Sequence, residues 1–138
     1  MAGEILLDTC AAIWITDQEQ LLPAAKQALE TSAQSRIPVM VSITSAWEMG
    51  MLLARKTVLS SMSAQAWFDA LVVPPFSQAV NLSAPILINA PFLPGQPPRD
   101  PFDRLFISTA REHGYRIMTR DRKILDYAEQ GHVQAIAC

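Results

Sequence analysis

Two aspartates in the segment Arg99–Arg104 are the first residues whose types and spacing suggest chemistry. Asp100 stands directly before Pro101, which is typical of a helix N-cap and first helical residue, because proline lacks the N–H that would have no partner there. Asp103 then falls in the first helical turn, where the helix dipole favours a carboxylate. Both acids are therefore explained by the helix end alone. A chemical role requires that other acids, distant in the sequence, lie at the same place.

Three other acids follow segments that we expect to be buried strands. Asp8 ends the apolar run that opens the chain, Asp121 directly follows a short strand near the C-terminus, and Glu48 lies one helical turn after the β-branched strand 38–43. In an open parallel sheet, ligands bind outside the carboxyl ends of the strands. Each acid also has a simpler interpretation: Asp8 and Asp121 as N-caps, and Glu48 as part of a capping box that begins at Ser45.

Taken together, four carboxylates at one edge of a sheet require a cation. Two like charges about 4 Å apart repel by about 4 kcal/mol at an effective dielectric constant of about 20. A helix N-terminus stabilises each charge by only about 0.3–1 kcal/mol. Oxygen ligands without histidine or cysteine favour Mg²⁺ or Mn²⁺ over zinc. The chemistry that fits such a site is phosphodiester hydrolysis by a metal-activated water.

The composition predicts one domain, residues 1–138, that buries part of its surface against another chain. Half of the residues are hydrophobic and 17% are charged. The net charge of −2 excludes a surface that is basic throughout, although seven of the eleven basic residues follow Pro98. Among these, Arg104 and Arg120 flank the acids, either as contacts to substrate phosphates or as salt-bridge partners within the cluster.

The termini and cysteines indicate a cytoplasmic protein. No apolar run is long enough to span a bilayer, and the first residues lack the basic region of a signal peptide. We therefore expect no membrane partner. Cys10 and Cys138 lie at opposite ends of the chain and belong to no CxxC or Cys/His cluster, so neither a disulfide nor a zinc site is expected.

Strands and helices alternate along the chain, which predicts an α/β fold with a mostly parallel sheet. Trp14, Trp47 and Trp67 lie on apolar helical stripes and are predicted to be core or interface residues. The proline-rich segment 91–98 is predicted to be a surface loop. The expected strands are 4–8, 38–43, 79–81, 116–119 and 133–136, and the expected helices are 11–16, 21–34, 83–88, 101–113 and 121–128, with two more that start at Ser45 and Ser63.

Four short motifs resemble those of PIN-domain nucleases. They are Leu6–Thr9, Ser45–Glu48, Asp100–Arg104 and Thr119–Arg122. Within that family the chain most resembles the VapC toxins of bacterial type II toxin–antitoxin pairs, and the resemblance runs from Ile5 to the last strand. It implies a PIN-like three-layer α/β/α fold around the mostly parallel sheet.

The resemblance also implies a site with two groups of residues. The metal-binding and catalytic quartet would be Asp8, Glu48, Asp103 and Asp121. The supporting residues would be Asp100, Thr9, Thr119 and Arg104, of which the two threonines would contact ligand waters.

The implied activity is that of a Mg²⁺- or Mn²⁺-dependent endoribonuclease. Its partners would be an RNA substrate, a second copy in a homodimer and a VapB-type antitoxin, and the chain alone is not expected to bind DNA. Alternatives within the fold are a housekeeping RNA-processing nuclease and a non-catalytic PIN-like binding module. A haloacid-dehalogenase-like phosphatase is disfavoured, because it needs a second aspartate where this chain has Cys10. A nucleotide-binding Rossmann domain lacks support, because no glycine-rich turn follows the first strand.

Overall fold

The computed structural model describes residues 3–58 and 60–138. The strands are β1 (Ile5–Leu7), β2 (Val39–Ser42), β3 (Ser77–Val80), β4 (Arg116–Thr119) and β5 (Gln134–Ala137). The helices are α1 (Thr9–Thr16), α2 (Pro23–Gln34), α3 (Ile43–Ala54), α4 (Ala64–Leu71), α5 (Ala84–Asn89), α6 (Pro101–His113) and α7 (Arg122–Glu129), and a 3-10 turn, η1 (Ala90–Phe92), follows α5.

The five strands form one sheet in the order β3-β2-β1-β4-β5, and every pairing in it is parallel. The central strand β1 places Leu6 opposite Met40 of β2 and Ile117 of β4. The strand order reverses between β1 and β4, and a reversal of this kind opens a crevice at the carboxyl ends of the two strands. The predicted α/β fold and parallel sheet are confirmed.

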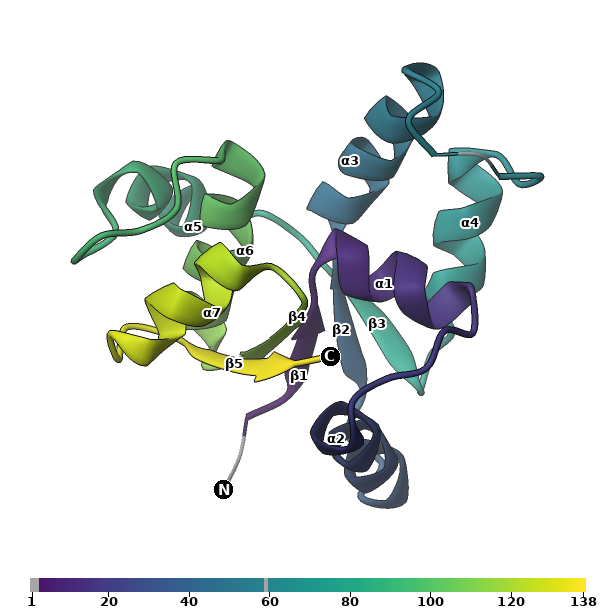
Figure 1. Cartoon of the computed structure of the whole chain (residues 1–138), viewed down its shortest axis with the longest axis horizontal. Coiled ribbons are helices and arrows are strands. Elements are labelled where there is room, and N and C mark those ends of the chain that lie inside the picture. Colours follow the sequence, from purple (N-terminus) through teal and green to yellow (C-terminus); the bar gives the residue numbers. More distant parts are fainter. Residues whose placement is uncertain (1–2, 59) are drawn as a thin grey trace.

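Helices cover both faces of the sheet (Figure 1), and each face has its own apolar core. Because side chains alternate along a strand, Ile5 and Leu7 pack into one core while Leu6 packs into the other. The first core includes residues of α1, α2 and α4, and the second is filled mainly by α6 and α7. This arrangement is the predicted three-layer α/β/α fold.

Most predicted helix starts are confirmed by side-chain caps. Asp8, Ser63, Asp100 and Asp121 each accept a hydrogen bond from a backbone N–H in the first turn of the following helix. Helix α6 ends as predicted at Gly114, whose φ of 75° is a left-handed conformation that glycine adopts without strain. The caps place Asp8 and Asp121 at the carboxyl edge of the sheet, and the cap at Asp100 places Asp103 in the first turn of α6 at the same edge.

The predicted capping box at Ser45 is wrong. Helix α3 begins at Ile43, directly after β2, and its cap is Ser42, whose hydroxyl accepts from the N–H of Thr44 at 3.0 Å. Ser45 is instead a fully buried residue within the helix. Glu48 therefore lies in the second turn of α3, where it has no capping role.

The exposure of two segments bears on earlier predictions. Trp67 is buried in the core, whereas 61% of Trp47 is exposed, so Trp47 is not a core residue and its place in an interface stays a prediction. The segment 91–98 lies mostly at the surface, as predicted, and a hydrogen bond fastens it to α7. Tyr127 donates its hydroxyl to the carbonyl oxygen of Pro94 at 2.7 Å, and Pro98 is buried.

Candidate active site

Asp8 is the most deeply buried of the candidate acids, with 4% of its surface exposed. Its Oδ1 accepts from the N–H of Ala11 at 2.7 Å, which caps α1, and its Oδ2 accepts from the hydroxyl of Thr119 at the end of β4. Thr119 Oγ1 in turn accepts from the N–H of Asp121 at 2.9 Å. The ends of β1 and β4 are thus joined through Asp8, which is both a cap and a member of the cluster.

Asp103 and Asp121 face each other across the same edge. The pKa of Asp103 is raised to about 7, first by burial and then by the neighbouring charges of Asp121 and Asp100. The two carboxyl groups are close enough that protonated Asp103 donates to Asp121. They meet because Asp103 is in the first turn of α6 and Asp121 caps α7, and both helices begin at the carboxyl edge of the sheet.

Glu48 reaches this edge from α3. Burial raises its pKa, hydrogen bonding with Thr9 opposes the rise, and the charge of Asp100 adds to it. The Thr9 hydroxyl also donates to Ser45 Oγ at 3.0 Å, a contact that joins the first turns of α1 and α3. Thr9 is therefore a buried link between two helices rather than a solvent-facing group.

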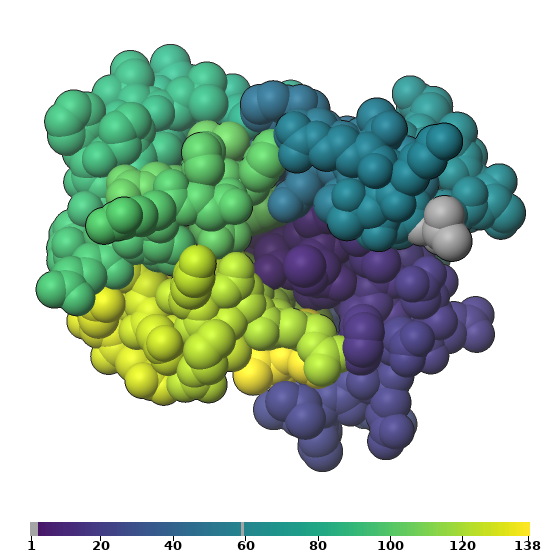
Figure 2. Space-filling view, turned by 45° about the horizontal axis from the view of Figure 1, so that its top comes forward, coloured from purple at the N-terminus to yellow at the C-terminus, as the bar shows by residue number. Residues whose placement is uncertain are grey.

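The Cys10 thiol shows that the four carboxylates lie in one region. Its pKa is raised to about 11, first by burial and then by each of the four predicted acids. The pKa of Asp8 is raised to about 6 by burial and by the charges of Asp121 and Glu48, against the opposing hydrogen bonds from Thr119 and Ala11. In Figure 2 the start of α1 lies recessed between the surfaces of α3, α6 and the segment that enters α7. The structure thus brings the predicted quartet to one hollow.

The donor set of this hollow fits a hard divalent cation. Within residues 3–58 and 60–138, no three His, Cys, Asp or Glu side chains converge tightly enough to hold an ion as they stand. Mg²⁺ demands oxygen ligands but retains several waters, so carboxylates that surround it need not all touch it. The raised pKa values of Asp8 and Asp103 show that negative charge is unfavourable here without a cation. A positive ion removes that cost.

The supporting residues divide into two groups. Thr119 and Asp100 lie at the edge of the site. Thr119 is hydrogen-bonded to Asp8, and Asp100 is exposed at the N-cap of α6. The Arg104 side chain makes structural hydrogen bonds instead. Its Nη1 donates to the carbonyl oxygens of Ala90 at 3.3 Å and Pro91 at 3.4 Å. It holds η1 against α6 and makes no salt bridge with an acid among the described residues, whereas its predicted contact to a substrate phosphate stays a prediction.

Sequence reasoning assigned no aromatic side chain to the site, yet two pairs lie at its border. Trp47 and Phe102 meet edge to face with their ring centroids 5.0 Å apart, and the guanidinium carbon of Arg120 lies 3.7 Å from the centre of the Trp14 ring. Trp47, Phe102 and Arg120 each stand one position before an acid of the quartet. Their position next to the predicted acids was the feature of the sequence that could have indicated their place at the border of the site.

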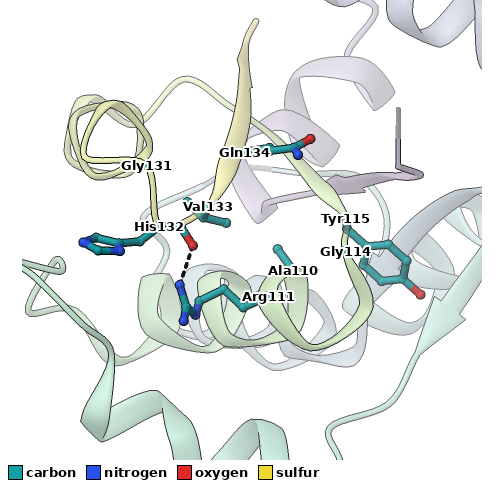
Figure 3. A pocket seen from close by; sticks show the side chains of 8 residues that line it. All are labelled: Ala110, Arg111, Gly114, Tyr115, Gly131, His132, Val133 and Gln134. Atoms are coloured by element: carbon teal, nitrogen blue, oxygen red, sulfur yellow. Dashed lines mark hydrogen bonds between the residues drawn. The ribbon is translucent and has the colours of Figure 1, made fainter. Parts of the chain in front are cut away.

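A separate pocket opens at the opposite edge of the sheet (Figure 3). It has a volume of about 350 Å³ and is lined by residues that precede β4 and β5, among them Gly114, Tyr115 and Gly131. Arg111 crosses it and donates to the carbonyl oxygen of His132. Because it lies at the amino ends of these strands, this pocket is remote from the carboxylates.

Comparison with known proteins agrees with this geometry. The PIN domain family model matches residues 5–130. The chain therefore belongs to the PIN-domain family. Within that family it is 31% identical over 121 residues to Ribonuclease VapC22 of Mycobacterium tuberculosis, an alignment that covers 87% of this chain and 88% of the relative.

Solved structures share the fold at lower identity. VapBC2 from Rickettsia felis, bound to a DNA fragment from its promoter, matches with a TM-score of 0.68 at 13% identity, covering 96% of this chain and 97% of the other. A toxin–antitoxin complex from Klebsiella pneumoniae matches with a TM-score of 0.61 at 24% identity, covering 96% of each chain. The predicted resemblance to PIN-domain proteins of the VapC type is confirmed.

Proposed function

We propose that this protein is a Mg²⁺- or Mn²⁺-dependent endoribonuclease that acts as the toxin of a VapBC-type toxin–antitoxin pair. One observation supports the proposal: four carboxylates lie near enough to Cys10, just after β1 and Asp8, that each raises the pKa of its thiol, in a PIN-domain chain that is 31% identical to a ribonuclease. The crevice at the carboxyl ends of β1 and β4 is where an open parallel sheet binds its ligands.

The chain's own residues have distinct tasks in this proposal. Asp8, Asp103 and Asp121 hold the ion directly or through its waters, and Glu48 completes the quartet from α3. Thr119 fixes the orientation of the Asp8 carboxylate through its hydroxyl. A bound Mg²⁺ or Mn²⁺ would supply an activated water and stabilise charge on the phosphate oxygens.

The test is cleavage of total bacterial RNA by the purified protein with Mg²⁺, Mn²⁺ or EDTA, with Mn²⁺ binding followed separately by electron paramagnetic resonance. We expect cleavage with either ion and none in EDTA. Mn²⁺ should bind the wild-type protein and bind the Asp103→Asn variant more weakly. Cleavage that persists in EDTA would refute the metal requirement, and a protein that binds Mn²⁺ but cuts no RNA would refute the ribonuclease assignment.

We propose a VapB-type antitoxin as the protein partner. The names of two structural neighbours, a VapBC2 complex and a toxin–antitoxin complex, support this partner class. Co-expression with the product of an adjacent small reading frame should give a stable complex that no longer cuts RNA. If no neighbouring product binds, the housekeeping RNA-processing alternative is favoured instead.

The same proposal includes a homodimer, for which α5 and η1 supply an apolar surface. Leu87, Ile88 and Phe92 are 48%, 62% and 81% exposed there. We expect Phe92→Glu to raise the dissociation constant of the dimer at least about tenfold, because the interface would bury an unpaired charge. Sedimentation equilibrium measures this constant. The matched control is Phe76→Glu before β3, which is 72% exposed in the wild type and should leave the dimer intact. Equal behaviour of the two variants would place the interface elsewhere.

We place the protein in the cytoplasm, where its RNA substrate would be found. Cys10 and Cys138 are unpaired thiols, which suits a reducing compartment. Within the described part of the chain, no helix combines the length and apolar character needed to cross a membrane.

A further inference from the structure

Trp47 is a large aromatic side chain left exposed at the border of the carboxylate cluster. It is 61% exposed, although Ser45 and Met49, two positions to either side of it on α3, are buried. Successive residues of a helix point about 100° apart, so a side chain one position from Glu48 is directed to the border of the site rather than into it. The edge-to-face contact with Phe102 fixes the Trp47 ring and leaves a face open to solvent.

Arg120 forms a second arrangement at the same edge, beyond α1. Its guanidinium carbon lies 3.7 Å from the centre of the Trp14 ring, and the Trp14 indole N–H is bound by the carbonyl oxygen of Gln20 at 3.1 Å. The ring is thus fixed from one side and supports the guanidinium on its face. Among the described residues, Arg120 makes no salt bridge, although it adjoins Asp121. Its N–H donors remain available for a ligand.

The two arrangements stand beside different acids of the quartet. Trp47 joins α3 to α6, which carry Glu48 and Asp103. Trp14 lies six residues after Asp8, a helical rise of about 9 Å along α1. A strand that contacts both arrangements therefore runs beside Glu48 and Asp103 at one of them and beside Asp121 at the other.

We propose that these residues position one unpaired RNA strand across the cluster, with Trp47 stacked on a base and Arg120 bound to a backbone phosphate. The inference rests on the proposed ribonuclease function and adds two residues that position the RNA strand. An aromatic side chain can stack on a base that is free of its neighbours in a single strand. In a duplex the faces of the bases are already covered by the adjacent base pairs, so this contact is not available. Arg120, stacked in advance on Trp14, offers planar donors that match a phosphate.

The two contacts have different signatures in binding experiments. Stacking of one base contributes about fivefold to 100-fold in affinity and is insensitive to salt, whereas a phosphate contact contributes through released counterions. Trp47→Leu should therefore weaken binding without changing the slope of log K against log salt. Arg120→Gln should weaken binding and reduce that slope by about 0.7.

The experiment measures fluorescence anisotropy of a labelled, mixed-sequence 12-nucleotide single-stranded RNA in Mg²⁺, with every variant made in an Asp103→Asn background to suppress cleavage. A blunt duplex of the same sequence is the second probe. We expect preference for the single strand, loss of that preference in Trp47→Leu, and its retention in Trp47→Phe. Arg122→Gln is the control for Arg120, because Arg122 is exposed but bound to Asp126 and Glu129.

Several results would overturn the inference. Unchanged single-strand affinity in Trp47→Leu, equal salt slopes for Arg120→Gln and Arg122→Gln, or conversion of a dimer to a monomer by Trp47→Leu would each do so. If Trp47→Leu does not fold, quenching of Trp47 fluorescence by RNA, assigned by its loss in Trp47→Phe, decides instead, and no quenching refutes stacking. Wild-type protein that cuts no RNA refutes the ribonuclease function, whereas cleavage with unaltered Trp47 and Arg120 variants refutes only this inference.

Discussion

Asp103→Asn is expected to lower the rate of RNA cleavage at least about 100-fold. Groups that merely orient metal ligands typically cost 10- to 100-fold when they are lost, so a direct ligand should cost no less. The substitution keeps the size of the side chain and removes the charge that a cation needs. Asp103 is half-buried next to Asp121 and near the charge of Asp8. Water therefore cannot take over the role of its carboxylate at this position.

Asp100→Asn is the matched control for this change. Asp100 is the exposed cap of α6, three residues before Asp103, and asparagine caps helices about as well as aspartate. We expect less than about a tenfold loss of cleavage from it. Initial rates with Mg²⁺ and Mn²⁺, together with thermal unfolding of both variants, make the comparison. Equal losses in the two variants would show that the site is not centred on Asp103.

The ends of a helix were predictable from the sequence where the conformational preferences of the residues at those ends match the folded structure. Asp100 before Pro101 and Gly114 after the last turn mark both ends of α6, because each has a conformational preference that neighbours do not change. The start of α3 was not predictable in this way. Ser42 and Ser45 are both good caps, and the choice depends on how far β2 pairs with its neighbours, which is a property of the assembled sheet.

The proximity of two of the predicted acids was predictable for a geometric reason. The carboxyl ends of parallel strands share one edge, so Asp8 after β1 and Asp121 after β4 had to lie near each other. The aromatic border could not be predicted, because an apolar stripe does not show which of its members faces the core. Trp47 and Trp67 look alike in the sequence, but only Trp67 is buried. The contact of Arg120 with Trp14 joins segments 106 positions apart and depends on the pairing of β1 with β4, which brings α1 beside the end of β4.

In the metal-free protein, Asp8→Asn is expected to raise the free energy of unfolding at pH 8. Burial raises the pKa of Asp8 to about 6 from an ordinary 3.8, so the folded state binds the proton more tightly than the unfolded state does. Stability from this group is fully present below pH 4 and is lost as the pH rises through 6. A shift of about two units corresponds to about 3 kcal/mol at most. Asparagine carries no charge to bury, and it keeps an oxygen that can accept from Ala11.

Urea unfolding in EDTA at pH 4, 6 and 8, at one protein concentration, measures this effect. The difference in unfolding free energy between variant and wild type should grow as the pH rises from 4 to 8, in favour of the variant. Added Mg²⁺ should then stabilise the wild-type protein at pH 8 and leave the variant nearly unchanged, because the ion offsets the buried charge only where that charge exists. A variant that is less stable than the wild type at pH 8 without metal would contradict this account. In that case the hydrogen bonds of Asp8 with Ala11 and Thr119 would outweigh its charge, and the cluster would be a structural element more than a cation site.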